Sequence, residues 1–268
     1  MVIHATGTTG TIGRHIQTKV QKLEVDLSEK VPSFPQSKFQ VTDTVIHLAG
    51  IVGAQSVEKD LQHSYRVNVE STIELGLTLK KSPIKKMVYV STSHVYDYSD
   101  RPLYEDDAVQ PRSEYASQKR EAEVALLEIF SDSPERLCVA RVFSVLDWDV
   151  PTFTLGGAVA KLRDENLGFV LGNGGDIRDF LTPKTVAFAL LEISQNENLY
   201  GISNVCSGSG LSVKEAALAM LNSGVGSTIY ESRIDPGFSN IPYIVGDNSK
   251  LRGALPHLDL SWTPSTPT

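Results

Sequence analysis

The amino terminus places a short apolar run directly before three evenly spaced glycines. Residues 2–6 are suited to a buried strand, and Gly7, Gly10 and Gly13 follow it. Glycine is required where a turn is tight and where backbone N–H groups approach an anion, and the amino end of a following helix adds partial positive charge. A glycine-rich turn can be only a turn, but its position after a buried strand favours a phosphate-binding loop. We therefore expect a strand, this loop and a helix over residues 11–21.

Strand-like and helix-like segments alternate through the first half of the chain. This alternation predicts a parallel sheet wrapped by helices, in which ligands bind at the carboxyl ends of the strands. After Val145 the pattern loosens into loops with proline and glycine. We expect a nucleotide-binding domain over residues 1–145, to which later segments return, and a smaller substrate-binding lobe over residues 146–268. Strands are expected at 2–6, 44–49, 86–91 and 137–143, and helices at 61–80, 115–130, 184–194 and after a capping box at 212–215.

A tyrosine and a lysine lie four residues apart, at Tyr115 and Lys119, within the helix expected at 115–130. Such residues lie on one helix face, about 6 Å apart, so the ammonium can lower the pKa of the phenol and prepare it for proton exchange. Taken alone, this spacing also occurs on ordinary solvated helix faces. The presence of this pair in the same chain as a phosphate-binding loop favours dehydrogenase chemistry.

Composition narrows the classes of partner. A chain of 268 residues with 41% hydrophobic content can bury a full core, and its net charge of −7 argues against nucleic acid held through phosphate contacts. The sequence contains no run of about 18 apolar residues and no signal-peptide pattern, so no membrane partner is expected and a cytoplasmic location is predicted. Cys138 and Cys206 both lie in apolar, strand-like segments and are expected to be buried free thiols.

Several ordered motifs resemble the extended short-chain dehydrogenases, the NAD-dependent epimerase/dehydratase family that modifies nucleotide sugars. Besides the glycine loop and the Tyr115/Lys119 pair, the matching segments are VIHLAG at 45–50, VNV at 67–69, VYVSTSHVY at 88–96, GNGGDIRDF at 172–180, NVCSG at 204–208 and GDNSKL at 246–251. The resemblance covers nearly the whole chain. It implies a Rossmann-type, doubly wound parallel sheet of the α/β class, NAD or NADP as cofactor, and a nucleotide-sugar substrate.

The resemblance assigns roles to residues of this sequence. Thr92 would hydrogen-bond the reacting sugar oxygen, Tyr115 would exchange its proton, and Lys119 would bind the nicotinamide ribose. Without the other two residues, Thr92 would be read as a strand-end hydroxyl that bonds local backbone. The expected cofactor-binding residues are Gly7, Gly10, Thr11, Ile12, Gly13, Asp26, Leu27, Leu48, Ala49, Gly50, Asn68, Val90, Tyr115, Lys119 and Val142.

The segment after Gly13 is shorter than the family pattern. Only twelve residues separate Gly13 from Asp26. The segment 23–27 can be the second strand, whose carboxylate would bind the adenosine ribose and favour NAD, or the third strand, with Asp26 near the adenine. Alternatively, Asp26 caps a helix that begins after it.

Substrate contacts are expected at Thr92, Ser93, His94, Ser144 and Arg178. Arg178 resembles the family arginine that binds the diphosphate of the nucleotide sugar, and the alternative is an ion pair with a neighbouring aspartate. Val142 and Ser144 replace a proline and an asparagine that the family often has. A lone histidine such as His94 is more often structural, and no spacing of His, Cys and Asp residues indicates a metal site.

The carboxyl terminus departs from the family as well. Residues 262–268, rich in proline and threonine, end where relatives continue into a final helix, and they are expected to form a flexible tail. Family members commonly pair through the helices expected at 61–80 and 115–130, so a homodimer is expected by analogy.

Two functions follow from the resemblance. One is an oxidoreductase or epimerase acting at C4 of a nucleotide-linked sugar, as a 4-ketoreductase or 4-epimerase. The other is a cofactor-binding relative that has lost catalysis and serves as a sensor or scaffold.

Overall fold

The computed structural model describes residues 1–23, 39–152, 154–163, 170–221, 230 and 232–264. Its centre is a six-stranded parallel sheet with the strand order β2-β1-β3-β4-β5-β8. Four of these strands are buried along their whole length or nearly so, which is why apolar residues predominate in their sequences. The strands are β1 (Ile3–Thr6), β2 (Gln21–Lys22), β3 (Thr44–His47), β4 (Lys86–Thr92), β5 (Leu137–Val142) and β8 (Gly201–Val205).

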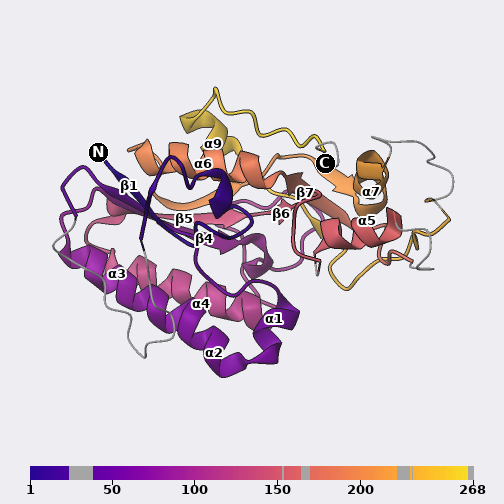
Figure 1. Cartoon of the computed structure of the whole chain (residues 1–268), viewed down its shortest axis with the longest axis horizontal. Helices are drawn as coiled ribbons and strands as arrows, with labels where there is room; N and C mark the ends of the chain where they lie inside the picture. The colour runs from indigo at the N-terminus through magenta and orange to yellow at the C-terminus, as the bar shows by residue number, and fades with distance from the viewer. Residues whose placement is uncertain (24–38, 153, 164–169, 222–229, 231, 265–268) are drawn as a thin grey trace.

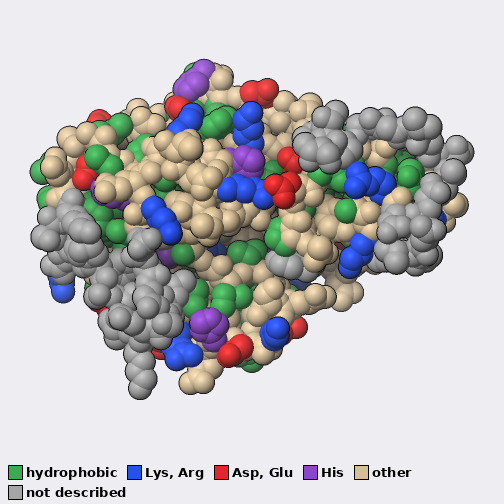
Figure 2. Space-filling model, in the orientation of Figure 1, with side chains coloured by type: hydrophobic (Ala, Val, Ile, Leu, Met, Phe, Trp, Pro, Cys, Tyr) green, Lys and Arg blue, Asp and Glu red, His purple; other side chains and the backbone are tan. Residues whose placement is uncertain are grey.

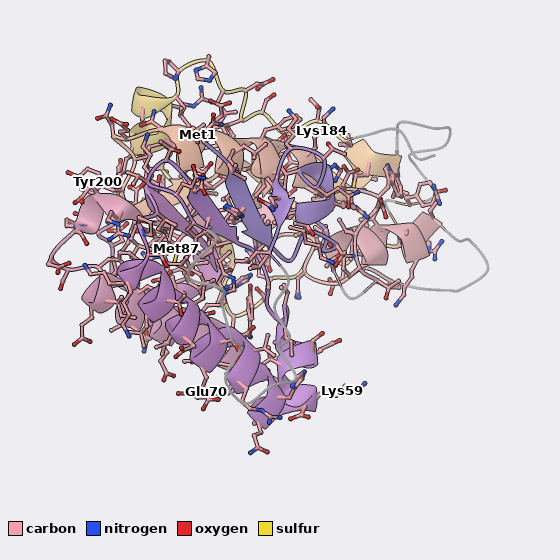
Figure 3. The ribbon with its side chains drawn as sticks, turned by 60° about the vertical axis from the view of Figure 1, so that its left-hand side comes forward. Met1, Lys59, Glu70, Met87, Lys184 and Tyr200 are labelled. Atoms are coloured by element: carbon pink, nitrogen blue, oxygen red, sulfur yellow. The ribbon has the colours of Figure 1, made fainter. Side chains whose placement is uncertain are left out.

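Helices cover both faces of this sheet (Figure 1). On one face lie α3 (Ser71–Lys81) and α4 (Glu114–Ile129), preceded by the short helices α1 (Ala54–Lys59) and α2 (Leu61–Tyr65). Figure 3 shows the α1 and α2 end of this layer, marked by Lys59 and Glu70, projecting away from the sheet. On the other face lie α6 (Pro183–Gln195) and α9 (Ser249–Ala254). The predicted α/β doubly wound fold is confirmed.

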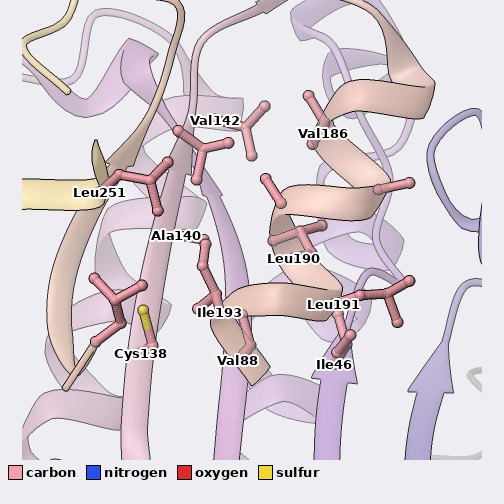
Figure 4. Close-up of a cluster of buried hydrophobic side chains, with 14 of the residues drawn as sticks. Ile46, Val88, Cys138, Ala140, Val142, Val186, Leu190, Leu191, Ile193 and Leu251 are labelled. Carbon is pink, nitrogen blue, oxygen red and sulfur yellow. The ribbon is translucent and has the colours of Figure 1, made fainter. Parts of the chain in front are cut away.

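Helix α6 is seated on the sheet by apolar side chains from both elements. Figure 4 shows Val186, Leu190 and Ile193 of α6 pointing toward Val88 and Ala140 of the central strands. All five side chains are fully buried. At roughly 1.5–3 kcal/mol for each large apolar side chain removed from water, this contact is the main force that holds α6 against the sheet.

A buried lysine also joins α6 to the sheet. Lys86, at the start of β4, donates from Nζ to the carbonyl oxygens of Ile193, Asn196 and Leu199, at 3.3 Å for Ile193 and 2.9 Å for Leu199. The last carbonyls of a helix have no partner within the helix, and a cation at this end also matches the helix dipole. Lys86 therefore caps the carboxyl end of α6 from the sheet.

A smaller sheet lies beyond the carboxyl ends of the main strands (Figure 1). Its strand order is β10-β7-β6, and β9 pairs with β7 in the antiparallel direction. Helices α5 (Leu155–Arg163) and α7 (Val213–Leu221) pack beside it, and the predicted capping box begins α7, where the Glu215 N–H donates to Ser212 Oγ at 3.0 Å. Its strands are β6 (Ser144–Val145), β7 (Ile177–Leu181), β9 (Gly210–Ser212) and β10 (Tyr243–Ile244).

The chain differs from expectation immediately after the glycine loop. The helix predicted over residues 11–21 is wrong: the structure has a single 3₁₀ turn, Gly13–His15, and β2 already begins at Gln21. Because His4 pairs with Gln21 in parallel, the chain must return to the amino end of β1 within a few residues, which leaves no room for a longer helix. Among the described residues the second strand is Gln21–Lys22. The segment 24–27, with the predicted cofactor residues Asp26 and Leu27, lies outside the described residues, so neither reading of it is tested.

The carboxyl-terminal segment is also anchored more firmly than expected. Trp262 donates from Nε1 to the carbonyl of Leu146 at 3.0 Å, and its ring lies 5.7 Å from that of Phe180. The tail is therefore fixed to the smaller sheet at its first residue, which corrects the expectation of flexibility there.

Cys138 and Cys206 are buried and free, as predicted.

Within the described segments, no helix has both the length and the apolar character needed to cross a membrane. Figure 2 shows acidic and basic side chains interspersed over one face of the molecule, with no continuous basic patch there.

Candidate active site

The glycine loop lies where the strand order reverses, between β1 and β3. Gly7 has a positive φ of 67°, and a Cβ on it would lie 2.6 Å from the backbone nitrogen of Ala49. A Cβ on Gly13 would collide with the carbonyl of Gly7, whereas one on Gly10 would make only an ordinary contact at 3.4 Å. Gly7 and Gly13 are thus required by the fold of the loop, and Gly10 leaves space at its surface.

The same loop presents unpaired donors. Among the described residues, the backbone N–H groups of Thr11 and Ile12 donate to no protein acceptor, although their neighbours close the turn with bonds such as Gly10 N–H to Gly7 O at 3.1 Å. Free N–H groups at the start of a helical turn are suited to a diphosphate. The loop therefore fits the phosphates of a dinucleotide.

A buried polar cluster fixes the carboxyl end of β3 to this loop. Thr6 Oγ1 lies 2.7 Å from Nδ1 of His47 and accepts the N–H of Ala49 at 3.2 Å. Nε2 of His47 lies 3.0 Å from Oγ1 of Thr72 on α3. Burial, with the neighbouring charge of Lys119, lowers the pKa of His47 to about 3, so the ring is neutral. This uncharged cluster sets the position of Leu48, Ala49 and Gly50, three of the predicted cofactor residues.

Asn68 holds the next part of the same edge. Its amide forms two bonds to the backbone of Ile51, at 2.8 and 3.0 Å, and donates to Gln118 on α4 at 2.9 Å. It lies within a π-helical turn, Arg66–Glu70, between α2 and α3. The side chain of Asn68 therefore positions the loop after β3.

The three predicted catalytic residues meet at the carboxyl end of β4. Thr92 ends that strand, and Tyr115 and Lys119 lie on the first turns of α4, which Ser113 caps by accepting the Ala116 N–H at 3.2 Å. Thr92 accepts the His94 N–H at 3.3 Å, and its hydroxyl lies close enough to the Tyr115 phenol to lower the pKa of that phenol. The local backbone contact expected for Thr92 thus coexists with the contact to Tyr115.

Burial governs the acidity of both helical residues. It raises the pKa of Tyr115 to about 12, partly offset by the hydrogen bond to Thr92. Burial lowers the pKa of Lys119 to about 8, and the charge of Glu123 opposes that shift. The prediction that Lys119 lowers the pKa of Tyr115 is therefore not met in this state, because desolvation of the phenol dominates.

A buried ion pair lies behind these residues and was not singled out from the sequence. Glu123, one turn after Lys119, accepts two bonds from Arg141 on β5, at 3.1 and 2.8 Å, and also binds Arg120 and Ser91. The side chains of Glu123 and Arg141 are almost completely buried. The i+4 spacing from Lys119 to Glu123 was the available sequence signal.

The predicted substrate residues lie along the junction with the smaller sheet. Arg178 pairs with Asp176 at 2.8 Å and donates to the carbonyl of Ile241 at 2.7 Å, so the alternative ion pair is present. Ser144 pairs with Phe180 in the smaller sheet. Ser93 is buried, whereas part of the His94 side chain is exposed. Desolvation by the atoms packed around the His94 ring, and then the nearby charge of Arg178, lower the pKa of His94. In the part of the chain described, no group of three His, Cys, Asp or Glu residues gathers to hold a metal ion.

Comparison with known proteins identifies this arrangement. The model of the NAD dependent epimerase/dehydratase family matches residues 24–206, a segment that begins after the glycine loop. The chain belongs to this family. It is therefore an NAD(P)-dependent enzyme, of the group that includes nucleotide-sugar epimerases and reductases.

Individual relatives support the assignment. GDP-6-deoxy-D-mannose reductase of Pseudomonas aeruginosa is 26% identical over 80% of this chain and 77% of its own. Probable UDP-arabinose 4-epimerase 3 of Arabidopsis thaliana is 25% identical over 65% of this chain and 48% of its own. Among solved structures, RMD from Pseudomonas aeruginosa complexed with NADPH superposes with a TM-score of 0.77 and 22% identity, covering 99% of this chain and 94% of that one.

Proposed function

We propose that this enzyme acts at C4 of a nucleotide-linked sugar, as a 4-ketoreductase or a 4-epimerase. The observation that carries the proposal is the proximity of the Tyr115 phenol and the Thr92 hydroxyl at the sheet edge that also holds the glycine loop, with Lys119 one turn further along α4. A phenol and a hydroxyl that lie side by side can both reach one carbinol or carbonyl oxygen. This geometry suits oxidation or reduction at a single sugar carbon.

The residues of the glycine loop and Lys119 fit a nicotinamide dinucleotide. The free N–H groups of Thr11 and Ile12 would hold its diphosphate, and Lys119 would bind the nicotinamide ribose. When bound, this cofactor supplies or accepts the hydride. Tyr115 donates a proton to the sugar oxygen during reduction and removes it during oxidation, while Thr92 orients that oxygen.

The residues after Thr92 favour these two reactions over dehydration. Sugar 4,6-dehydratases of the family carry an acidic pair at these positions, whereas this chain has Ser93 and His94. A hydroxyl and an imidazole supply no carboxyl group for that proton transfer. The similarity to a GDP-6-deoxy-D-mannose reductase supports the reductase, and the similarity to a UDP-arabinose 4-epimerase supports the epimerase.

Product analysis separates the alternatives. A 4-ketoreductase oxidises NADPH or NADH when given a 4-keto-6-deoxy nucleotide sugar, whereas a 4-epimerase interconverts C4 epimers without net change in the cofactor. A 4-keto-6-deoxy product formed from a 6-hydroxy nucleotide sugar would show dehydratase chemistry and refute the proposal. Purified protein that binds NADPH and a nucleotide sugar but turns over none of these substrates would instead identify a sensor or scaffold.

Tyr115→Phe tests the proton transfer. The variant keeps the ring and loses only the hydroxyl, so turnover should fall by roughly 10²–10⁴-fold while the dissociation constant for the cofactor stays close to that of the parent. Unchanged turnover would exclude Tyr115 as the proton donor.

A further inference from the structure

The ammonium of Lys119 has an unusual environment for a buried cation. Its side chain is almost fully buried, yet within the described residues it makes neither a hydrogen bond nor an ion pair. Its Nζ lies 4.3 Å from the centroid of the Tyr89 ring. The negative face of an aromatic ring attracts a cation at this distance, and the attraction grows when water is excluded.

The other groups around Lys119 leave this role to the ring. Glu123 is the nearby carboxylate, but its oxygens are already bound by Arg141, Arg120 and Ser91. On the β3 side His47 is neutral, and on α4 Tyr115 is a protonated phenol. Glu123 therefore favours the charged state of Lys119 from a distance, and the direct contact is with Tyr89.

The Tyr89 ring is itself held rigidly. It stacks on His47, with centroids 5.9 Å apart and an interplanar angle of 25°, and His47 is fixed by Thr6 and Thr72. The hydroxyl of Tyr89 is buried without a hydrogen-bond partner in the described structure. The contact of Tyr89 with Lys119 is therefore made by the face of the ring and not by its hydroxyl.

We propose that Tyr89 is a positioning residue whose ring holds the Lys119 ammonium at the place where the cofactor is bound. The proposal rests on the function proposed above, because it concerns how Lys119 is prepared for that role. A lysine side chain has four flexible methylene groups, and a fixed ring beneath the ammonium removes much of this freedom before the ligand arrives. The ring also stabilises the protonated form without competing for its hydrogen bonds.

The test measures the dissociation constants of NADPH and NADH between pH 6 and 10. Parent affinity should fall as Lys119 loses its proton, near pH 8. Tyr89→Leu and Tyr89→Met both remove the ring. They should weaken binding at neutral pH and move the fall to lower pH by roughly half a unit to one unit, because the charged form loses its support. Tyr89→Phe keeps the ring and should restore the parent profile.

Phe130→Leu is the matched control. Phe130 belongs to the same buried cluster as Tyr89 and has cations over its own ring, from Lys80 and Arg136, far from the site. This variant should melt at a lower temperature but keep the parent pH profile. Tyr89→Met provides a second measurement of the pH profile if Tyr89→Leu does not fold.

Two failures can be told apart with Lys119→Met. If Lys119→Met binds cofactor weakly while the Leu and Met variants at position 89 keep the parent profile, Tyr89 does not position Lys119 and this inference alone is overturned. If Lys119→Met binds NADPH and NADH as tightly as the parent, Lys119 is not at the cofactor site, and the site assignment under the proposed function fails together with the inference.

Discussion

Two buried lysine ammonium groups contact strand β4 or its neighbours, and they differ in their partners. At the start of the strand, Lys86 donates to three backbone carbonyls. Beside the middle of the strand, Lys119 of α4 lies over the Tyr89 ring and bonds to no polar atom of the described residues. Burial lowers the pKa of both lysines. The two lysines therefore differ in the hydrogen-bond partners of their ammonium groups and not in burial.

Under the proposed function, this contrast separates a structural cation from one that binds a ligand. A buried charge is costly unless its hydrogen bonds are satisfied, and Lys86 meets that requirement within the protein. Lys119 does not, so its donors remain available to a bound molecule. Perturbed acidity together with unsatisfied donors marks a functional group more reliably than either property alone.

The largest effect is expected from removing the cation over the Tyr89 ring. Lys119→Met should reduce kcat/KM by about 10²-fold or more, because both cofactor contact and placement of the reacting groups are lost. Its thermal stability should match or exceed that of the parent, since a buried charge without polar partners is removed. Steady-state kinetics and thermal melts check both parts; a stable variant with normal kcat/KM would contradict the functional role.

An intermediate effect of the opposite kind is expected at the amino end. Lys86→Met should lower the free energy of unfolding by about 2–4 kcal/mol, because the carbonyls at the end of α6 lose their buried donor. Cofactor affinity should remain close to that of the parent at temperatures where the variant is folded. Urea denaturation with NADPH titration tests this, and a stability equal to that of the parent would remove the structural half of the comparison.

The smallest effect concerns the pH dependence of stability. Lys119 has a pKa of about 8 in the folded state and about 10.4 when unfolded, so the unfolded chain binds more protons between these values. Relative to Lys119→Met, the parent should gain at most about 1.4 kcal/mol of stability for each pH unit above 8. Urea denaturation of both proteins at pH 7, 8 and 9 gives the free energy of unfolding of each. Subtracting the two values at each pH cancels the contribution of all other titrating groups. A difference that is constant with pH would show that the Lys119 pKa is not lowered.

The strands of the central sheet could be predicted because buried strands are rich in apolar residues. Residues 86–91 and 137–143 read as apolar runs between turn residues, and the observed strands begin at the same positions. The helix expected at 61–80 was found as α2, a π-helical turn and α3, because Asn68 bonds the backbone of Ile51 at that point. Local pattern gives the existence of an element, whereas tertiary contacts decide its interruptions.

The site was predicted in part for the same reason. Thr92, Tyr115 and Lys119 follow from motifs with fixed local spacing, and the structure brings them to one edge. Tyr89 was not recognised because its ring resembles an ordinary core residue in an apolar strand, and Arg141 because its buried partner, Glu123, lies 18 residues away in the sequence. Their importance arises from neighbours on α4, which are distant in the sequence.

The sequence by itself determined the parallel sheet, the glycine loop, the three motif residues and the absence of an acidic pair after Thr92. Only the tertiary structure decided that the first helix is a single turn, that Arg178 pairs with Asp176, and that Lys86 and Lys119 differ in partners. Spacing and hydrophobic period depend on near neighbours in the chain. Hydrogen bonding and desolvation of a buried charge depend instead on every element packed around it.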